Sequence, residues 1–312
     1  MLRVSEIKLD LDHSEQELAD AICYKLAIKP AELLSYTIYK RSYDARRSAM
    51  CLIYIVDVNV TNEATVAKKL RNERHICPTP DMSYHYVGKA PANLSERPLV
   101  VGFGPCGVFA ALILAQMGFK PIVLERGKEV RERTQDTWGL WRKNTLNPES
   151  NVQYGEGGAG TFSDGKLYSQ VRDPRYLGRK VIEEFVKAGA PEEIVYVNRP
   201  HIGTFRLVGM VEKMRQNIID LGGEIRFEHK VSDILVDEQD GIRQIRGVVL
   251  ADGSEIRSNH VVMALGHSSR DTFKVLFERG VYIEAKPFSI GFRVEHPQSI
   301  IDTARLGKNA GH

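Results

Sequence analysis

Three glycines in the stretch VGFGPCG have the spacing G-x-G-x-x-G, between an apolar run and a helix-like segment. In that context Gly102 permits a tight turn, Gly104 lets the backbone approach a pyrophosphate, and Gly107 lets the helix pack close to the strand. The free N–H groups at the start of a helix also attract phosphate. The intervening positions are Phe103, Pro105 and Cys106. We therefore expect residues 102–107 to bind the phosphates of a dinucleotide, with a structural turn as the alternative.

An acidic residue, Glu125, ends the next apolar run, PIVLERG, about twenty residues beyond the glycines. A carboxylate at this position can accept both ribose hydroxyls of an adenosine, and it repels a 2′-phosphate. This disfavours NADP and leaves NAD and FAD open. Arg126, which follows directly, is included in the predicted site.

A second glycine-rich stretch, YGEGGAGTFSDGKL, runs from Tyr154 to Leu167. Flexible linkers are usually built from Ser and Gly repeats, whereas this segment also contains Thr161, Phe162 and Leu167. We expect its backbone to lie against a ligand. The predicted contacts are Gly157, Gly158, Gly160, Thr161, Ser163, Asp164 and Lys166. For SDGK a simple β-turn is equally open.

The elements that position these residues fall into two parts. Residues 1–90 read as β-α-β-β-α, close to a ferredoxin-like sandwich, with Ser14 and Glu17 spaced as a capping box for the first helix. The basic cluster YKRSYDARRS at the junction of the two long strands fits a solvated hairpin tip or a binding surface. Residues 91–98 form a linker. The chain as a whole is predicted to be an α/β protein.

The second part begins at Leu99 with a complete β-α-β unit. Residues 99–165 and 220–270 form a Rossmann-like nucleotide-binding domain, with a β-meander turning at Asp240-Gly241 and at Asp252-Gly253. Its last strand, HVVMALG, ends at Ala264, Leu265 and Gly266, where the chain can pass close to a nucleotide. Residues 166–219 and 271–312 are assigned to a partial substrate domain.

Composition narrows the class of protein. The 312 residues carry a net charge of +3 without a basic tract, which argues against nucleic acid as a partner. The first residues lack the apolar run of a secretory signal, and the apolar run from Val108 is too short to span a bilayer, so we expect a cytoplasmic protein without a membrane segment. The four cysteines show no C-x-x-C pair, which argues against a zinc site or a disulfide framework.

The ordered set VVGFGPCG, VLERG, the glycine-rich segment, HKVSDI and VVMALG resembles the flavoproteins with two dinucleotide-binding domains related to glutathione reductase. Together with KPFSIGFRVEHPQ and the N-terminal module, it is similar over nearly the whole chain to the bacterial family called uncharacterised FAD-dependent dehydrogenases. The resemblance implies non-covalently bound FAD. The pyrophosphate would lie at Gly102, Gly104 and Gly107, the ribose at Glu125 and the adenine beside Val231, with residues 264–266 crossing near the cofactor.

The resemblance implies a cofactor but names no reaction. From the three ordered nucleotide-binding features we expect an FAD-dependent oxidoreductase of unknown small-molecule substrate, with a nicotinamide donor left open. The glycine-rich segment would then run beside the flavin, where Lys166 could stabilise the reduced ring. Because Cys106 has no nearby partner cysteine, a disulfide-reductase mechanism is disfavoured. His267, Arg293 and His296 are candidate polar contacts, with helix capping or solvent exposure as their alternatives.

One feature of the flavoprotein pattern is missing from the chain. A late Gly-Asp pair usually meets the ribityl chain and pyrophosphate in such proteins, and no such pair follows Phe288. We therefore expect a chain truncated at its C-terminus relative to the family, and its cofactor affinity and activity stay open. Two other functions stay open: a non-catalytic flavin- or dinucleotide-binding protein whose N-terminal module docks a partner such as RNA, and an NAD-dependent dehydrogenase without flavin.

Overall fold

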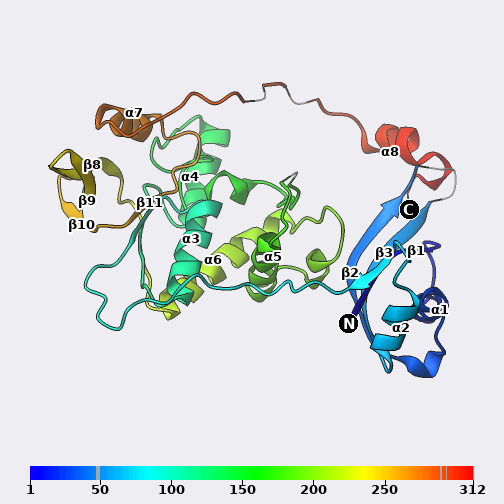
Figure 1. Ribbon diagram of the computed structural model, residues 1–312. Coiled ribbons are helices and arrows are strands. Elements are labelled where there is room, and N and C mark those ends of the chain that lie inside the picture. Colours follow the sequence, from blue (N-terminus) through cyan, green and yellow to red (C-terminus); the bar gives the residue numbers. More distant parts are fainter. Residues whose placement is uncertain (47–49, 170, 289, 293, 312) are drawn as a thin grey trace. The chain divides into compact units, whose positions relative to one another are not determined.

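The computed structural model describes residues 1–46, 50–169, 171–288, 290–292 and 294–311. It divides into two compact units, whose elements are labelled in Figure 1. Unit 1 comprises Met1–Met82, Glu193–Pro200 and Lys286–His312, and unit 2 comprises Ser83–Glu192 and His201–Ala285. Arg293 and the end of the basic cluster at Arg47 and Ser48 lie outside the described residues.

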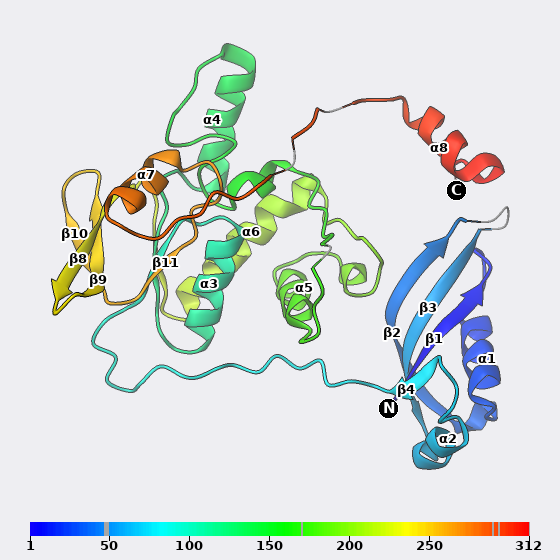
Figure 2. The same cartoon turned by 45° about the horizontal axis from the view of Figure 1, so that its top comes forward.

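Unit 1 contains a four-stranded antiparallel sheet in the order β2-β3-β1-β4. Its elements along the chain are β1 (Leu2–Leu9), α1 (Glu15–Leu26), β2 (Leu33–Asp44), β3 (Cys51–Val60), α2 (Glu63–Lys69) and β4 (Ile76–Pro78). This is the ferredoxin-like arrangement, and it confirms the predicted β-α-β-β-α order while adding β4. Figure 2 shows α1 and α2 on the same side of this sheet. A short helix, α8 (Gln298–Leu306), lies in the last segment of the unit.

The sequence pattern explains the packing of unit 1. Alternate residues of β3, including Tyr54, Val56 and Val58, are buried and share one core with Ile22 and Leu26 of α1. Ser14 and Glu17 form the predicted capping box, because the Glu17 N–H donates to Ser14 Oγ at 3.2 Å and the Ser14 N–H donates to Glu17 Oε2 at 2.6 Å.

A buried ion pair joins two strands of this sheet. The Arg3 guanidinium donates to both carboxylate oxygens of Asp57 at 2.8 Å, and both residues are nearly inaccessible to solvent. The Thr79 hydroxyl also donates to Asp57, and the Tyr39 ring lies 3.6 Å from the guanidinium carbon. Each charge is therefore matched, as burial of ionised groups requires.

Unit 2 is built on a four-stranded parallel sheet in the order β11-β5-β6-β7. The sheet strands are β5 (Leu99–Val101), β6 (Ile122–Leu124), β7 (Glu224–Arg226) and β11 (Val261–Met263). The helices are α3 (Pro105–Gln116), α4 (Val130–Lys143), α5 (Leu177–Lys187), α6 (Thr204–Asp220) and α7 (Arg270–Glu278). Strands β5 and β6 are wholly apolar and buried, which is typical of parallel sheets. In both Figure 1 and Figure 2, α3 and α6 lie next to each other, in agreement with their contacts.

A second sheet in unit 2 is antiparallel, with the order β10-β9-β8. It consists of β8 (Val231–Gln239), β9 (Ile242–Leu250) and β10 (Glu255–Arg257), and the expected turns fall between these strands. The predicted β-α-β unit and meander are therefore confirmed. Residues 166–192 and 201–219, which the sequence assigned to a substrate domain, lie in the same compact unit as residues 99–165. The substrate domain itself stays a prediction.

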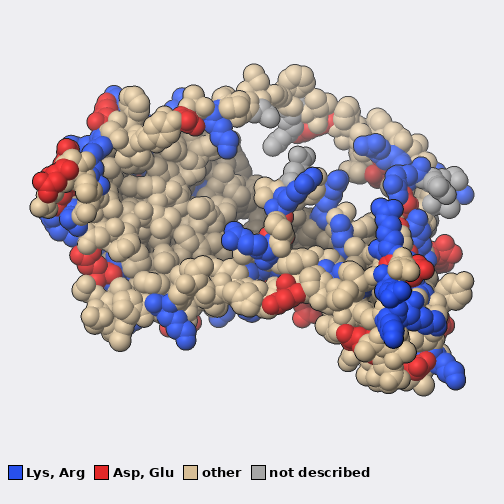
Figure 3. All heavy atoms as spheres, in the orientation of Figure 1, with Lys and Arg blue, Asp and Glu red and all other residues tan. Residues whose placement is uncertain are grey.

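Among the described residues, no helix is long and apolar enough to cross a bilayer. Figure 3 shows few charged side chains in the middle of the visible face of unit 2, with acidic and basic side chains toward its edges. In unit 1, Lys and Arg side chains gather over β2 and β3.

Candidate dinucleotide site

A cavity of about 300 Å³ opens in unit 2 where three parallel strands end. Its wall contains Gly102 directly after β5, Glu125 directly after β6, and Ala264 directly after β11. The carboxyl ends of parallel strands are where α/β folds bind their ligands. The remaining wall comes from the glycine-rich segment, from the start of β8 and from the turn before α7.

The G-x-G-x-x-G motif forms the turn between β5 and α3. Gly102 has a φ of +99°, and a Cβ on it would lie 2.5 Å from the carbonyl oxygen of Ala264. A Cβ on Gly107 would lie 1.9 Å from the carbonyl oxygen of Gly102, so the helix can approach the strand only with glycine at this position. Gly104 precedes α3, whose first-turn N–H groups lack helical acceptors.

The glycine-rich segment lies directly against this motif. The Gly157 N–H donates to the Phe103 carbonyl at 2.8 Å, and a Cβ on Gly158 would lie only 2.9 Å from the Cα of Gly104. Gly158, Ala159 and Gly160 all line the cavity. These glycines therefore let two stretches of backbone meet and leave main chain, rather than side chains, in the cavity wall.

Glu125 joins three segments of the site. Its buried carboxylate accepts backbone N–H groups from Phe103 at 2.7 Å, Gly127 at 2.9 Å and Gly155 at 2.9 Å. A carboxylate has about four lone-pair positions. Within the described residues, the three donors leave Glu125 with one position for a ligand hydroxyl rather than the two that the sequence predicted.

Two further buried charges fix the segment from Asn151 to Gly160. The Arg133 guanidinium donates to the carbonyls of Asn151 at 2.8 Å, Val152 at 2.8 Å and Glu156 at 2.6 Å. Burial lowers the pKa of Arg133 to about 10, so it stays charged at neutral pH. Loop carbonyls solvate the cation where water cannot.

The Glu156 side chain is completely buried behind the same segment. Its Oε2 accepts the N–H of Val130, the first residue of α4, at 2.8 Å, and lies 3.4 Å from Arg215 Nη1. Burial raises the pKa of Glu156 to about 7, although the Val130 N–H and the charge of Arg215 oppose the rise. The segment from Asn151 to Gly160 therefore contains a buried carboxyl group, that of Glu156, which changes its charge near neutral pH.

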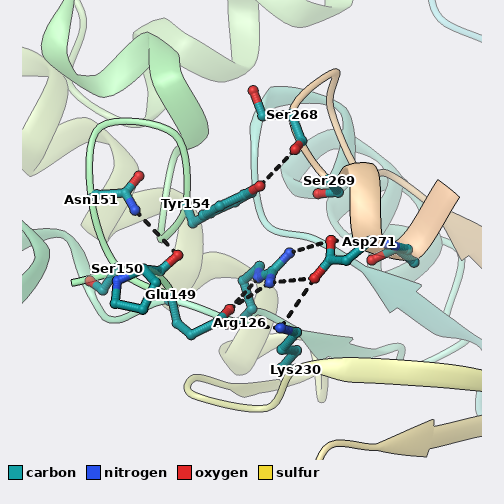
Figure 4. Close-up of polar contacts among 12 residues, drawn as sticks. Arg126, Glu149, Ser150, Asn151, Tyr154, Lys230, Ser268, Ser269 and Asp271 are labelled. Atoms are coloured by element: carbon teal, nitrogen blue, oxygen red, sulfur yellow. Dashed lines mark hydrogen bonds and ion pairs between the residues drawn. The ribbon is translucent and has the colours of Figure 1, made fainter. Parts of the chain in front are cut away.

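A network of four charges borders the cavity (Figure 4). Arg126 lies 2.6 Å from Glu149 and 2.8 Å from Asp271, and Lys230 lies 2.8 Å and 3.1 Å from the same two carboxylates. The Arg126 guanidinium also lies 4.3 Å from the centre of the Tyr154 ring. The hydrogen bond from Arg126 is the main reason that the pKa of Asp271 is well below its usual range.

Most of the predicted site residues lie together in the cavity wall. They are Gly102, Phe103, Gly104, Pro105, Cys106, Glu125, Arg126, Gly158, Gly160, Val231, Ala264, Leu265 and Gly266. Their contact with a cofactor stays a prediction.

Six predicted residues are not in this wall: Gly107, Gly157, Thr161, Ser163, Asp164 and Lys166. The SDGK stretch makes a local turn, in which Ser163 Oγ donates to the Gly160 carbonyl at 2.7 Å and accepts the Gly165 N–H at 3.0 Å. The Lys166 side chain is 78% exposed, and its ammonium lies 3.6 Å from Asp164. The buried Thr161 hydroxyl donates to the Glu156 carbonyl. The turn alternative is therefore the one that the local contacts favour.

Several wall residues were missed from the sequence. They include Tyr154, Gly155, Ala159, His229, Lys230, Ser268, Ser269 and Thr272. The first three belong to the glycine-rich stretch, and Lys230 directly precedes Val231, so their positions carried a signal. His267, a sequence candidate, also lines the cavity. Ser269 occupies the N-cap position of α7, but its hydroxyl donates to the Leu265 carbonyl instead of capping the helix.

The family and the curated relative that match this chain have no stated activity. Residues 1–59 match a family described as "Domain of unknown function (DUF8436)". An "Uncharacterized protein" of Clostridium beijerinckii is 40% identical over 318 residues, which is 100% of this chain and 57% of that protein. The chain thus spans little more than half the length of this curated relative.

Solved structures are only distantly similar. THI4 of Thermovibrio ammonificans is 16% identical with a TM-score of 0.41, covering 60% of this chain and 64% of that one. A 3-ketosteroid-delta4-(5alpha)-dehydrogenase from Rhodococcus jostii RHA1 is 14% identical with a TM-score of 0.34, over 56% and 48%. Lactococcus lactis thioredoxin reductase is 14% identical with a TM-score of 0.26, over 54% and 35%. Similarities this weak do not show a shared ligand.

Proposed function

We propose that unit 2 binds FAD non-covalently in this cavity, and that the protein is an FAD-dependent oxidoreductase acting on a small molecule. One observation carries the proposal. Segments far apart in the sequence, at Gly102, Glu125, Gly158 and Ala264, converge on a single cavity at the carboxyl ends of parallel strands. Gly102 and Glu125 have the residue types that a dinucleotide site requires at those places.

The residues of the wall fit such a ligand. The start of α3 supplies N–H groups and a partial positive charge for the pyrophosphate. Gly104 and Gly158 keep side chains out of the space beside it. The free lone-pair position of Glu125 accepts one ribose hydroxyl, and Val231 offers an apolar surface to the adenine.

Redox chemistry would come from the bound flavin itself. The part of this chain is to hold and orient the cofactor and to exclude water with the backbone at residues 158–160 and 264–266. The contacts of Lys166 with Asp164, outside the wall, do not support a role for that ammonium at the flavin ring. We therefore assign cofactor binding to these residues and leave the proton-transferring group unassigned.

The test is retention of flavin by the purified chain. After incubation with FAD and removal of unbound ligand, we expect flavin absorbance at about one equivalent per chain, and mass spectrometry of the released ligand should show intact FAD. A chain that gains no flavin absorbance at any FAD concentration contradicts the proposal. Anaerobic titration with NADH and with NADPH then decides whether a nicotinamide is the donor.

The basic side chains over β2 and β3 favour a second candidate, a non-catalytic flavin-binding protein whose unit 1 docks RNA (Figure 3). Arg41 and Arg46 are the described arginines of this cluster, although Asp44 pairs with Arg46 at 2.8 Å and weakens the case. Flavin that no donor reduces, together with RNA binding that falls with salt and with Arg41→Gln, would favour this candidate. Active turnover without RNA binding would eliminate it.

A further inference from the structure

Two carboxylates beside the cavity cancel the charge of two cations that line it. Arg126 and Lys230 belong to the wall, whereas Glu149 and Asp271 do not. Figure 4 shows the two carboxylates on either side of Arg126. Each cation contacts both carboxylates, at distances between 2.6 Å and 3.1 Å. The group of two cations and two anions therefore has no net charge. We call these four residues the charge quartet.

The quartet lies next to the residue predicted to meet the ribose. Arg126 directly follows Glu125, and Lys230 directly precedes Val231. Tyr154, whose ring lies under the Arg126 guanidinium, is followed by Gly155, which donates its N–H to Glu125. Cations at this place would attract a phosphate on the ribose if they were not already paired.

We propose that Glu149 and Asp271 are specificity-determining residues, which make the cavity reject adenine nucleotides that carry a 2′-phosphate. The inference rests on the proposed function, because it presumes an adenosine ribose at Glu125. Arg126 and Lys230 remain positioned to bind a phosphate dianion, and the two carboxylates prevent it by occupying their N–H groups and cancelling their charge. The chain thereby takes a dinucleotide with an unmodified ribose.

A purely structural role is the competing explanation. The quartet joins four segments that are distant in sequence, and the Tyr154 hydroxyl adds a hydrogen bond of 2.7 Å to the Ser268 carbonyl. A structural role predicts that loss of the carboxylates changes the binding of all adenine nucleotides alike, whereas our proposal predicts a change in their ratio.

The experiment compares two probes by calorimetry: adenosine 5′-monophosphate and adenosine 2′,5′-bisphosphate. The test variant is Glu149→Gln with Asp271→Asn. Its matched control is Glu212→Gln with Asp136→Asn, which frees Arg131 and Lys128 from their ion pairs outside the cavity wall and changes the net charge equally. FAD binding by each variant reports whether the site itself is intact.

We expect the wild-type chain to bind the monophosphate more tightly than the bisphosphate. In the test variant the ratio should shift toward the bisphosphate by about tenfold or more, and the shift should shrink as salt is added. The control variant should keep the wild-type ratio. An unchanged ratio in the test variant, or an equal shift in the control, overturns the inference while leaving FAD binding in place.

Failure of the proposed function would look different. In that case the wild-type chain would bind neither FAD nor the monophosphate, and both proposals would fall together. If the double variant does not fold, the single Glu149→Gln variant tests the same point, because it leaves Asp271 paired while removing one negative charge from both cations. Its ratio should move in the same direction by a smaller factor.

Discussion

Replacing Glu156 with Gln should stabilise unit 2 at neutral pH and remove most of its pH dependence between about pH 5 and about pH 8. The carboxyl group is completely buried, and its Oε1 has no hydrogen-bond partner among the described groups. Its Oε2 accepts the Val130 N–H at 2.8 Å, which a glutamine carbonyl can also do. The substitution therefore keeps the shape and that hydrogen bond while removing the charge.

The magnitude follows from the pKa. Burial raises the pKa of Glu156 from an ordinary value of 4.5 to about 7. The folded state thus holds the proton more tightly than the unfolded chain, so no stability is lost below the ordinary pKa. Stability then falls as the pH rises toward the folded pKa and levels off above it. A rise of this size corresponds to about 3 kcal/mol in the free energy of unfolding.

Urea unfolding followed by tryptophan fluorescence measures this effect locally. The chain has two tryptophans, Trp138 and Trp141, and both lie in α4, the helix whose first N–H is bound by Glu156. The control is Glu132→Gln, an exposed position on the same helix, which should keep the wild-type pH dependence. The reasoning is refuted if Glu156→Gln loses as much stability as the wild type between about pH 5 and about pH 8.

Three other substitutions test contacts within each of the two units. Gly158→Ala should weaken FAD binding about tenfold or more, because its Cβ would lie 2.9 Å from the Gly104 Cα. The control Gly88→Ala should leave FAD binding unchanged, because its Cβ meets open space. Fluorescence titration with FAD compares the two variants. Asp57→Asn should destabilise unit 1 by about 3 to 5 kcal/mol, since it removes the negative charge that accepts two buried hydrogen bonds from Arg3. A loss below about 1 kcal/mol in circular-dichroism melts would contradict this. Arg133→Lys replaces the guanidinium, whose three nitrogens reach three carbonyls, with an ammonium that has a single nitrogen. Limited proteolysis should therefore cut residues 150–160 faster, and an unchanged cleavage map would speak against that anchoring role.

The sequence was sufficient where local signals are strong. The G-x-G-x-x-G turn between a buried strand and a helix, the capping box at Ser14 and the Asp-Gly turns of the meander each depend on residues within a few positions of one another. Strand β4 was not predicted, because its three residues become a strand only by pairing with β1. Such an edge depends on the tertiary fold rather than on its own composition.

The site was predictable in its segments but not in its contacts. Residue types suggested that Glu125 faces a ribose, yet the three N–H groups that occupy its oxygens come partly from Gly155, thirty residues away along the chain. Likewise, the residue types in SDGK do not predict which part of the glycine-rich segment faces the cavity. Gly158 and Gly160 do so, whereas Lys166 does not. Glu149 and Asp271 gave no signal, because only folding brings them to the same two cations.

Equilibrium titration of the purified chain with FAD, monitored by flavin fluorescence, tests the central claim most directly. The account predicts saturable binding at about one FAD per chain, weakened in Gly158→Ala and retained in Gly88→Ala. FAD binding that is absent, or that Gly158→Ala leaves unchanged, would contradict the assignment of this cavity as the flavin site.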